Sequence, residues 1–161
     1  MRKLVSNGVL VLVGLVGPAA TGNSDRPIHS YCNDPRLNQL RIFFAKLNSP
    51  AIDYSTDFLV AADRHSLDWR LLPSIAIIES GGGKEYRNNN IFGWDSCRRS
   101  FATIQEGIHE VASRLQNSKL YKNKGLDQML QTYNTNEEYP VRVKNLMRRL
   151  GPRRVGDVRS N

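Results

Sequence analysis

The chain has 161 residues, of which 40% are hydrophobic and 24% are charged. This length and composition suit one globular domain with one core and argue against a second domain. The formal net charge of +8 is compatible with an anionic partner. The basic residues near the C-terminus are not interleaved with stacking aromatic residues, however, and we expect no nucleic-acid partner.

Residues 1–22 have the pattern of a secretory signal peptide. Arg2 and Lys3 give a positive start, an apolar run extends from Val9 to Val16, and Ala20-Thr21-Gly22 offers small residues for cleavage. An uncleaved anchor is the alternative, but the run is too short for roughly 30 Å of hydrocarbon. We expect cleavage, no stable membrane insertion, and a secreted, periplasmic or cell-envelope location in a bacterium.

The two cysteines of the chain are Cys32 and Cys97. In an oxidising compartment such a pair can form a disulfide, which would tie the N-terminal arm to the loop after Trp94. Two free thiols are the alternative, because the sequence shows no distance between them. A cysteine protease with His65 or His109 as base is less favoured, since neither cysteine lies in a nucleophile motif.

Residues 23–48 are expected to form an N-terminal arm and a first helix. The arm, up to Pro35, lacks periodicity. From Pro35 onward apolar residues recur at helical spacing, and Asn48-Ser49-Pro50 ends the pattern. A second helix is predicted over Thr56–Arg64, and His65 is expected in the connection that follows it.

The stretch from Leu67 to Trp94 carries the strongest functional signal. Apolar residues at helical spacing predict a helix that ends beside Glu79, because Ser80 and three glycines follow directly. A carboxyl group there meets the negative end of the helix dipole and loses hydration, and both effects favour its neutral form. A carboxyl group that stays protonated near neutral pH can act as a general acid. A solvated last-turn glutamate is the alternative.

The polar segment Lys84–Arg99 is expected to form a small lobe or hairpin that lines a cleft. Its asparagines, Asn88 to Asn90, and the nearby Trp94 combine amide groups with an aromatic face, as sugar recognition requires. The asparagines could instead serve only as turn residues, and Trp94 could belong to the core.

Glu85 and Asp95 are the carboxylates nearest to Glu79 in this segment. Either of them could hold a hydrolytic water beside the acid. The sequence does not decide between them.

Three further helices are predicted in the second half of the chain. Thr103 and Glu106 form a capping box that opens a helix to about Asn117. Apolar spacing predicts a short helix from Leu126 to Tyr133 and a last helix up to Leu150. Residues 153–161 form a basic tail.

Several of these motifs occur together and in order between Ser49 and Leu150, and together they resemble the lysozyme-like superfamily. The likeness is greatest to the bacterial endo-β-N-acetylglucosaminidases that cut peptidoglycan. One departure is that Ile91-Phe92-Gly93-Trp94 stands where soluble lytic transglycosylases usually carry Gly-Leu-Met-Gln. The matching motifs are Glu79-Ser80-Gly81, Asn90-Ile91-Phe92-Gly93-Trp94, Ser100-Phe101-Ala102-Thr103, Tyr133-Asn134-Thr135 and Tyr139-Pro140-Val141-Arg142-Val143.

The resemblance implies a mainly α, lysozyme-like (α+β) fold, with the glucosaminidase domain at 49–152. It implies a glycoside hydrolase that cleaves β-1,4 bonds between N-acetylglucosamine and N-acetylmuramic acid, works as a monomer on peptidoglycan strands, and needs no metal or cofactor. A lytic transglycosylase and a non-catalytic wall-binding or secretion-apparatus protein are the alternatives.

The resemblance also implies roles for single residues. Glu79 would be the general acid, and Tyr133 would orient the acid or the acetamido group of the substrate. The residues expected to bind substrate are Ser80, Asn90, Phe92 and Trp94.

Overall fold

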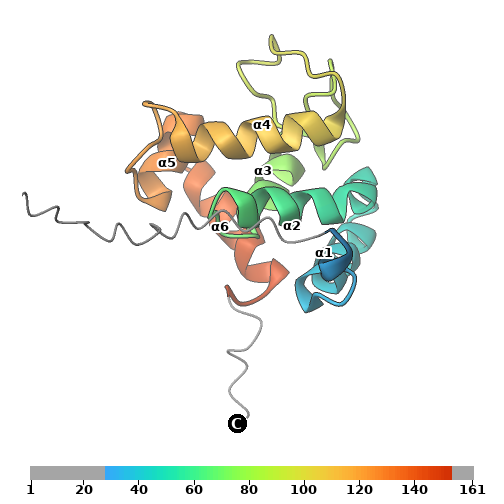
Figure 1. Cartoon of the computed structure of the whole chain (residues 1–161). Helices are drawn as coiled ribbons and strands as arrows, with labels where there is room; N and C mark the ends of the chain where they lie inside the picture. Colours follow the sequence, from blue (N-terminus) through green and yellow to red (C-terminus); the bar gives the residue numbers. More distant parts are fainter. Residues whose placement is uncertain (1–27, 154–161) are drawn as a thin grey trace, which may run out of the picture.

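The computed structural model describes residues 28–153, and this part of the chain is helical (Figure 1). No β-strand occurs among the described residues, which confirms the prediction of a mainly α protein. The expected signal peptide, residues 1–22, lies outside them, as does the basic tail beyond Arg153. The elements are η1 (Ile28–Tyr31), α1 (Pro35–Lys46), η2 (Pro50–Tyr54), α2 (Ser55–Arg64), α3 (Leu71–Ser80), α4 (Ile104–Asn117), α5 (Leu126–Tyr133) and α6 (Tyr139–Leu150).

The predicted helices agree with the observed ones to within a few residues, and side-chain caps fix the starts of α1 and α4. Asp34 caps α1 by accepting a hydrogen bond from the backbone N–H of Arg36 at 2.9 Å. At α4 the Thr103 hydroxyl accepts from the Glu106 N–H at 3.1 Å. The Glu106 carboxylate in turn accepts from the Ala102 N–H at 2.6 Å. Glu106 is therefore a capping residue, as the capping box predicts.

Helix α3 lies in the core of the bundle. Its first six residues, Leu71 to Ala76, are all buried, and it packs mainly against α6. Helices α2 and α4 run side by side and make the most extensive helix pair (Figure 1). The packing of α3 leaves its C-terminal end, with Glu79, at the edge of the core.

The segment between α3 and α4 is a loop without regular structure, seen at the top of Figure 1. The expected hairpin is reduced to one antiparallel bridge between Arg87 and Asn90. The three glycines after α3 all have positive φ, from 63° at Gly81 to 90° at Gly83. At Gly82 a Cβ atom would also lie 2.1 Å from the Ser49 hydroxyl. Glycine is therefore required where the chain leaves α3 and crosses η2.

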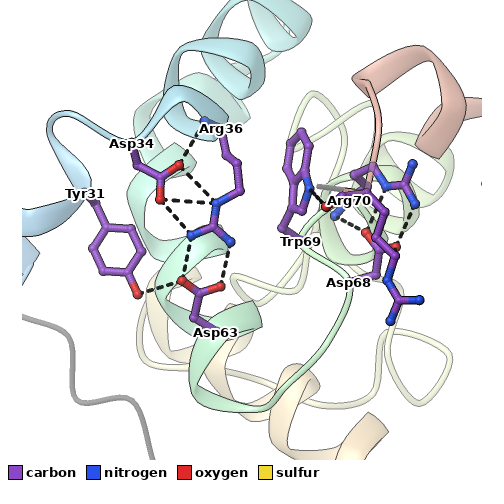
Figure 2. A network of polar contacts seen from close by, with 8 residues as sticks. Tyr31, Asp34, Arg36, Asp63, Asp68, Trp69 and Arg70 are labelled. Carbon is purple, nitrogen blue, oxygen red and sulfur yellow. Dashed lines mark hydrogen bonds and ion pairs between the residues drawn. The ribbon is translucent and has the colours of Figure 1, made fainter. Parts of the chain in front are cut away.

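A network of charged side chains joins η1, α1 and α2 (Figure 2). The guanidinium of Arg36 donates two hydrogen bonds to the Asp63 carboxylate, both 2.7 Å long, and three to Asp34, at 2.7 to 3.2 Å. Tyr31 donates to Asp63 at 3.1 Å from the opposite side. The hydrogen bonds to Asp63 and Asp34 raise the pKa of Arg36 further above its ordinary value. The expected featureless arm is thus anchored to α2, an outcome that periodicity could not indicate.

A second network anchors the end of α6 to the start of α3 (Figure 2). Arg70 pairs with Asp68 at 2.7 Å and donates to the Gly151 carbonyl at 2.7 Å. The indole N–H of the buried Trp69 donates to the Arg153 carbonyl at 3.0 Å. These contacts close the bundle at the end of α3 opposite to Glu79.

The structure contains no bridge between Cys32 and Cys97, and both are exposed free thiols. Cys32 follows η1, which packs on α2, whereas Cys97 lies in the loop between α3 and α4. Figure 1 shows these two segments on different sides of the bundle. The structure therefore has two free thiols, which is the alternative that the sequence left open.

None of the helices within residues 28–153 is long and apolar enough to cross a membrane.

Candidate active site

A cavity of about 770 Å³ opens at the C-terminal end of α3. Glu79 stands on one side of it, the loop after α3 forms a second wall, and residues from α4, α5 and the connection between them complete it. The lining residues are Glu79, Gly93, Trp94, Asp95, Ser96, Cys97, Arg99, Arg114, Leu120, Tyr121, Tyr133 and Asn134. The structure thus brings Glu79, Trp94, Asp95 and Tyr133 together, as the sequence interpretation requires.

The carboxyl group of Glu79 is in an environment that favours its protonated form. Burial raises the pKa of Glu79 above its ordinary value, while the Tyr139 hydroxyl and the Arg142 guanidinium act in the opposite direction. Its Oε1 atom is buried and, within residues 28–153, has no hydrogen-bond partner. The Tyr139 hydroxyl makes no hydrogen bond of standard geometry among these residues, and it still counts among the groups that lower the pKa of Glu79. A protonated carboxyl group with an unused oxygen can donate its proton to a bound molecule.

Gly93 brings the loop backbone against this carboxyl group. A Cβ atom at position 93 would lie 2.9 Å from Glu79 Oε2, and the residue has a φ of +61°. A side chain there would be strained and would press on the acid. Glycine keeps the carboxyl group accessible from the cavity while the loop passes directly beside it.

Aromatic rings form the wall next to Glu79. The ring of Trp94 meets that of Tyr133 edge to face with centroids 5.5 Å apart, and it meets Tyr121 at 5.8 Å. Tyr133 in turn stacks on Tyr139 at 5.9 Å. Trp94 is partly buried, so it packs against the core and still lines the cavity. The sugar contact expected of Trp94 stays a prediction.

The hydroxyl of Tyr133 donates a 2.6 Å hydrogen bond to the backbone carbonyl of Phe92. Burial raises the pKa of Tyr133 well above its ordinary value, and the nearby Glu79 adds to this effect. The phenol therefore stays neutral and holds the loop beside the acid.

Three residues expected to bind substrate do not line the cavity but support the loop that does. Ser80 is buried, donates to the Ile91 carbonyl at 2.7 Å and accepts from the Gly83 N–H at 2.9 Å. Phe92 is fully buried and meets Phe58 edge to face. Both residues therefore support the loop instead of contacting a ligand. The sequence could not show this, because residues from other parts of the fold bury them.

Asn90 is the third of these residues, and its buried amide determines the course of the loop. Its Oδ1 accepts from the Trp94 N–H at 3.0 Å, and its Nδ2 donates to the carbonyls of Trp94 and Arg99 at 2.9 and 3.1 Å. With 1% of its surface exposed, it has no face for a ligand. It fixes Trp94 and Arg99 relative to each other.

The two carboxylates considered as partners of Glu79 have different positions. Glu85 is exposed and does not line the cavity. Asp95 does line it, and pairs with the exposed Arg98 at 2.7 Å. Asp95 is thus the one of the two that could hold a water in the cavity.

The sequence interpretation missed several residues at this site. Arg99 and Arg114 line the cavity from the loop and from α4, and Leu120 and Tyr121 line it from the connection after α4. Arg99 belongs to the loop already expected to line a cleft, so it could have been predicted as a lining residue. Arg114 and the connection after α4 carry no local signal, because only helix packing turns them toward Glu79.

No group of three or more metal-ligating side chains occurs in the described part of the chain. Comparison with known protein families, with characterised proteins and with solved structures gives no match to this chain.

Proposed function

We propose that the protein is a lysozyme-like glycoside hydrolase that cleaves the β-1,4 bonds between N-acetylglucosamine and N-acetylmuramic acid in peptidoglycan. The observation that carries the proposal is the Glu79 carboxyl group, which has a raised pKa and a free buried oxygen at an aromatic-walled cavity. Glycoside cleavage requires such an acid beside a surface that holds a sugar ring. The order of the sequence motifs supports the same assignment.

In the proposed reaction Glu79 gives its proton to the glycosidic oxygen as the bond to the anomeric carbon breaks. The sugar develops oxocarbenium character, and the departing sugar keeps the proton. The exposed face of Trp94 offers a stacking surface for a pyranose ring. Tyr133 acts indirectly, because its hydroxyl is committed to the Phe92 carbonyl and holds the loop against the acid.

The second half of the reaction gives hydrolysis if a water attacks the anomeric carbon. Asp95 is the lining carboxylate that could activate this water, since Glu85 lies outside the cavity. The acetamido group of the substrate could instead assist, and the later attack of water would again give a reducing sugar.

A lytic transglycosylase is the second candidate, and the state of Asp95 favours it. Asp95 is exposed and already paired with Arg98, so Glu79 is the one lining carboxylate within residues 28–153 that is unpaired and desolvated. With one acid, the reaction can end when a hydroxyl of the substrate attacks the anomeric carbon and gives its proton to the Glu79 carboxylate, which restores the acid and forms an anhydro sugar.

Digestion of purified peptidoglycan, followed by mass spectrometry of the fragments, tests the proposal. We expect soluble fragments with reducing ends, whose terminal sugar identifies the bond that is cut. Anhydro ends would show that the protein is a lytic transglycosylase and not a hydrolase. Binding without any fragments would indicate a non-catalytic wall-binding protein, and absence of both would refute the proposal.

A further inference from the structure

Two arginines face the cavity from separate elements. Arg99 comes from the loop after α3 and Arg114 from α4, and both line the cavity that contains Glu79. About half of each side chain is exposed, at 52% for Arg99 and 50% for Arg114. Their guanidinium groups are therefore accessible to a molecule in the cavity.

The two arginines share one carboxylate, Glu110 of α4. Arg114 donates through Nε to Glu110 Oε1 at 2.9 Å, and Arg99 Nη2 lies 3.9 Å from the same oxygen, too far for a hydrogen bond. No other side-chain acceptor is bound by either guanidinium among residues 28–153. One carboxylate thus neutralises two cations only in part, and both keep N–H groups that can bind an anion.

The rest of the cavity wall does not cancel this charge. Asp95, an exposed carboxylate of the lining, is already paired with Arg98 at 2.7 Å. Around this part of the cavity the guanidinium groups of Arg98, Arg99 and Arg114 face the carboxylates of Asp95 and Glu110. Glu79, which also lines the cavity, adds no negative charge in its protonated form. The remaining positive charge lies at the site rather than being spread over the surface.

The position of Arg99 is fixed by the same residue that fixes the aromatic wall. The buried Asn90 amide binds the backbone carbonyls of both Trp94 and Arg99. The backbone positions that carry the stacking surface and the cation are thereby held together. Such preorganisation lowers the entropy cost when a ligand uses both.

We propose that Arg99 and Arg114 form a carboxylate-binding subsite, by which the cavity selects anionic glycans over neutral ones. The inference rests on the proposed function and specifies its substrate. Peptidoglycan carries carboxylates on its muramic acid residues, either on the lactyl group or on the attached peptide, whereas a polymer of N-acetylglucosamine carries none. The exposed Leu120 beside the arginines offers apolar contact for the methyl groups that accompany these carboxylates.

Binding of three oligosaccharides of equal length tests the subsite. One contains only N-acetylglucosamine, the second alternates with muramic acid that has free lactyl carboxylates, and the third carries peptides on its muramic acid. The dissociation constants are measured in a Glu79→Gln background, which prevents cleavage. We expect tighter binding of one or both anionic ligands, and the arm that gains more identifies the carboxylate source.

Arg99→Gln and Arg114→Gln should each weaken binding of the preferred anionic ligand by about fivefold, and the double variant by about tenfold or more. Binding of the neutral ligand should change less than about twofold, since that ligand has no carboxylate for the arginines to bind. Added salt should reduce the preference. Arg87→Gln is the matched control, because it removes one exposed positive charge from the same loop outside the cavity.

Thermal unfolding of each variant accompanies the binding measurement, and Tm should change little because the Arg114 and Glu110 pair is exposed. Equal affinity for all three ligands, or an equal loss for neutral and anionic ligands, would overturn the subsite and leave the proposed function intact. If no ligand binds and the unaltered protein cleaves no peptidoglycan, the proposed function fails and the subsite fails with it.

Discussion

Two regions of this molecule bury ionisable groups, and they differ in how completely those groups are hydrogen-bonded. Around Arg36 the charges of Asp34 and Asp63 are matched by hydrogen bonds of 2.7 to 3.2 Å (Figure 2). Around Glu79 burial is the main influence, and one carboxyl oxygen has no partner among the described residues.

The difference shows what each region can contribute. A buried charge with full hydrogen bonding holds its elements in place, and removing one partner destabilises the fold. Burial without such hydrogen bonds destabilises the charged form of a carboxyl group. The group therefore keeps its proton, which it can transfer to a substrate. We therefore expect changes at the Arg36 network to affect stability and changes at Glu79 to affect activity.

The largest effect is expected for Glu79→Gln. This change keeps the shape of the side chain and removes its transferable proton, so the rate of peptidoglycan cleavage should fall by roughly 10²–10⁴-fold. Fragment release measured at equal protein concentration gives the rate, and circular dichroism should show an unchanged fold. Full activity in this variant would remove Glu79 from the mechanism.

The pH dependence of stability gives a second test at the same residue. Because the pKa of Glu79 is raised on folding, the folded state binds more protons than the unfolded state above the ordinary value of 4.5. Stability should therefore fall as pH rises from that value through the raised pKa, and activity should fall over the same range.

Glu79→Gln should lack this loss of stability, so its Tm should equal that of the unaltered protein in acid and exceed it at neutral pH. A difference in Tm that does not vary with pH would show that Glu79 is not desolvated in solution.

Breaking the Arg36 network should affect stability and leave activity unchanged. Arg36→Gln leaves the carboxylates of Asp34 and Asp63 partly buried without their cation, and this should cost about 2–3 kcal/mol, less than for a fully buried pair. Arg41→Gln on the exposed surface of α1 is the control and should change little. Urea unfolding measures both. Equal stabilities would mean that the network is not important for the fold.

Replacing each of the two tryptophans by alanine separates the effect of packing on stability from its effect on binding. Trp94→Ala should lower stability by about 2 kcal/mol, because Trp94 is only partly buried, and should weaken glycan affinity by about 1–2 kcal/mol. Trp69→Ala, at the opposite end of α3, should cost about 3–5 kcal/mol of stability with no change in affinity. Unfolding and binding are measured on the same samples. Unchanged affinity after loss of Trp94 would leave it as a packing residue alone.

The smallest effect is expected at the cysteines, one of which lies beside each region. Cys32 is close in sequence to Asp34 and Cys97 lines the cavity, so a disulfide would join the two regions. Both are exposed thiols, and we expect two alkylated residues in native, unreduced protein by mass spectrometry. Cys32→Ser should change stability by less than about 0.5 kcal/mol. A monomer without free thiols would contradict this arrangement.

Sequence alone predicted the helices well. The positions of α1, α2, α4, α5 and α6 follow from apolar spacing and from end signals such as Asn48-Ser49-Pro50 and the capping box at Thr103. The placement of Glu79 in the last turn of α3 follows from the glycines after it, because few other residues adopt their positive φ. These features are local, so a short window of sequence contains them.

The candidate site was predicted only in part. Glu79, Trp94, Asp95 and Tyr133 do meet at one cavity, as the ordered motifs indicated. Ser80, Asn90 and Phe92 were expected at the ligand but support the loop from behind. Arg99 was expected only as part of the cleft-lining segment, and Arg114 was not expected at all. A motif shows that residues belong to one site, but it does not show which side of the backbone faces the cavity.

The amino-acid sequence by itself determined where the helices begin and end and which acid stands at the end of α3, since hydrogen bonding and backbone conformation over a few residues decide both. Only the tertiary structure decided that Arg36 is fully paired while Glu79 is not, and that Cys32 and Cys97 stay apart. Burial and charge pairing depend on distances between elements far apart in the chain. Those distances are fixed by the packing of the helices as a whole.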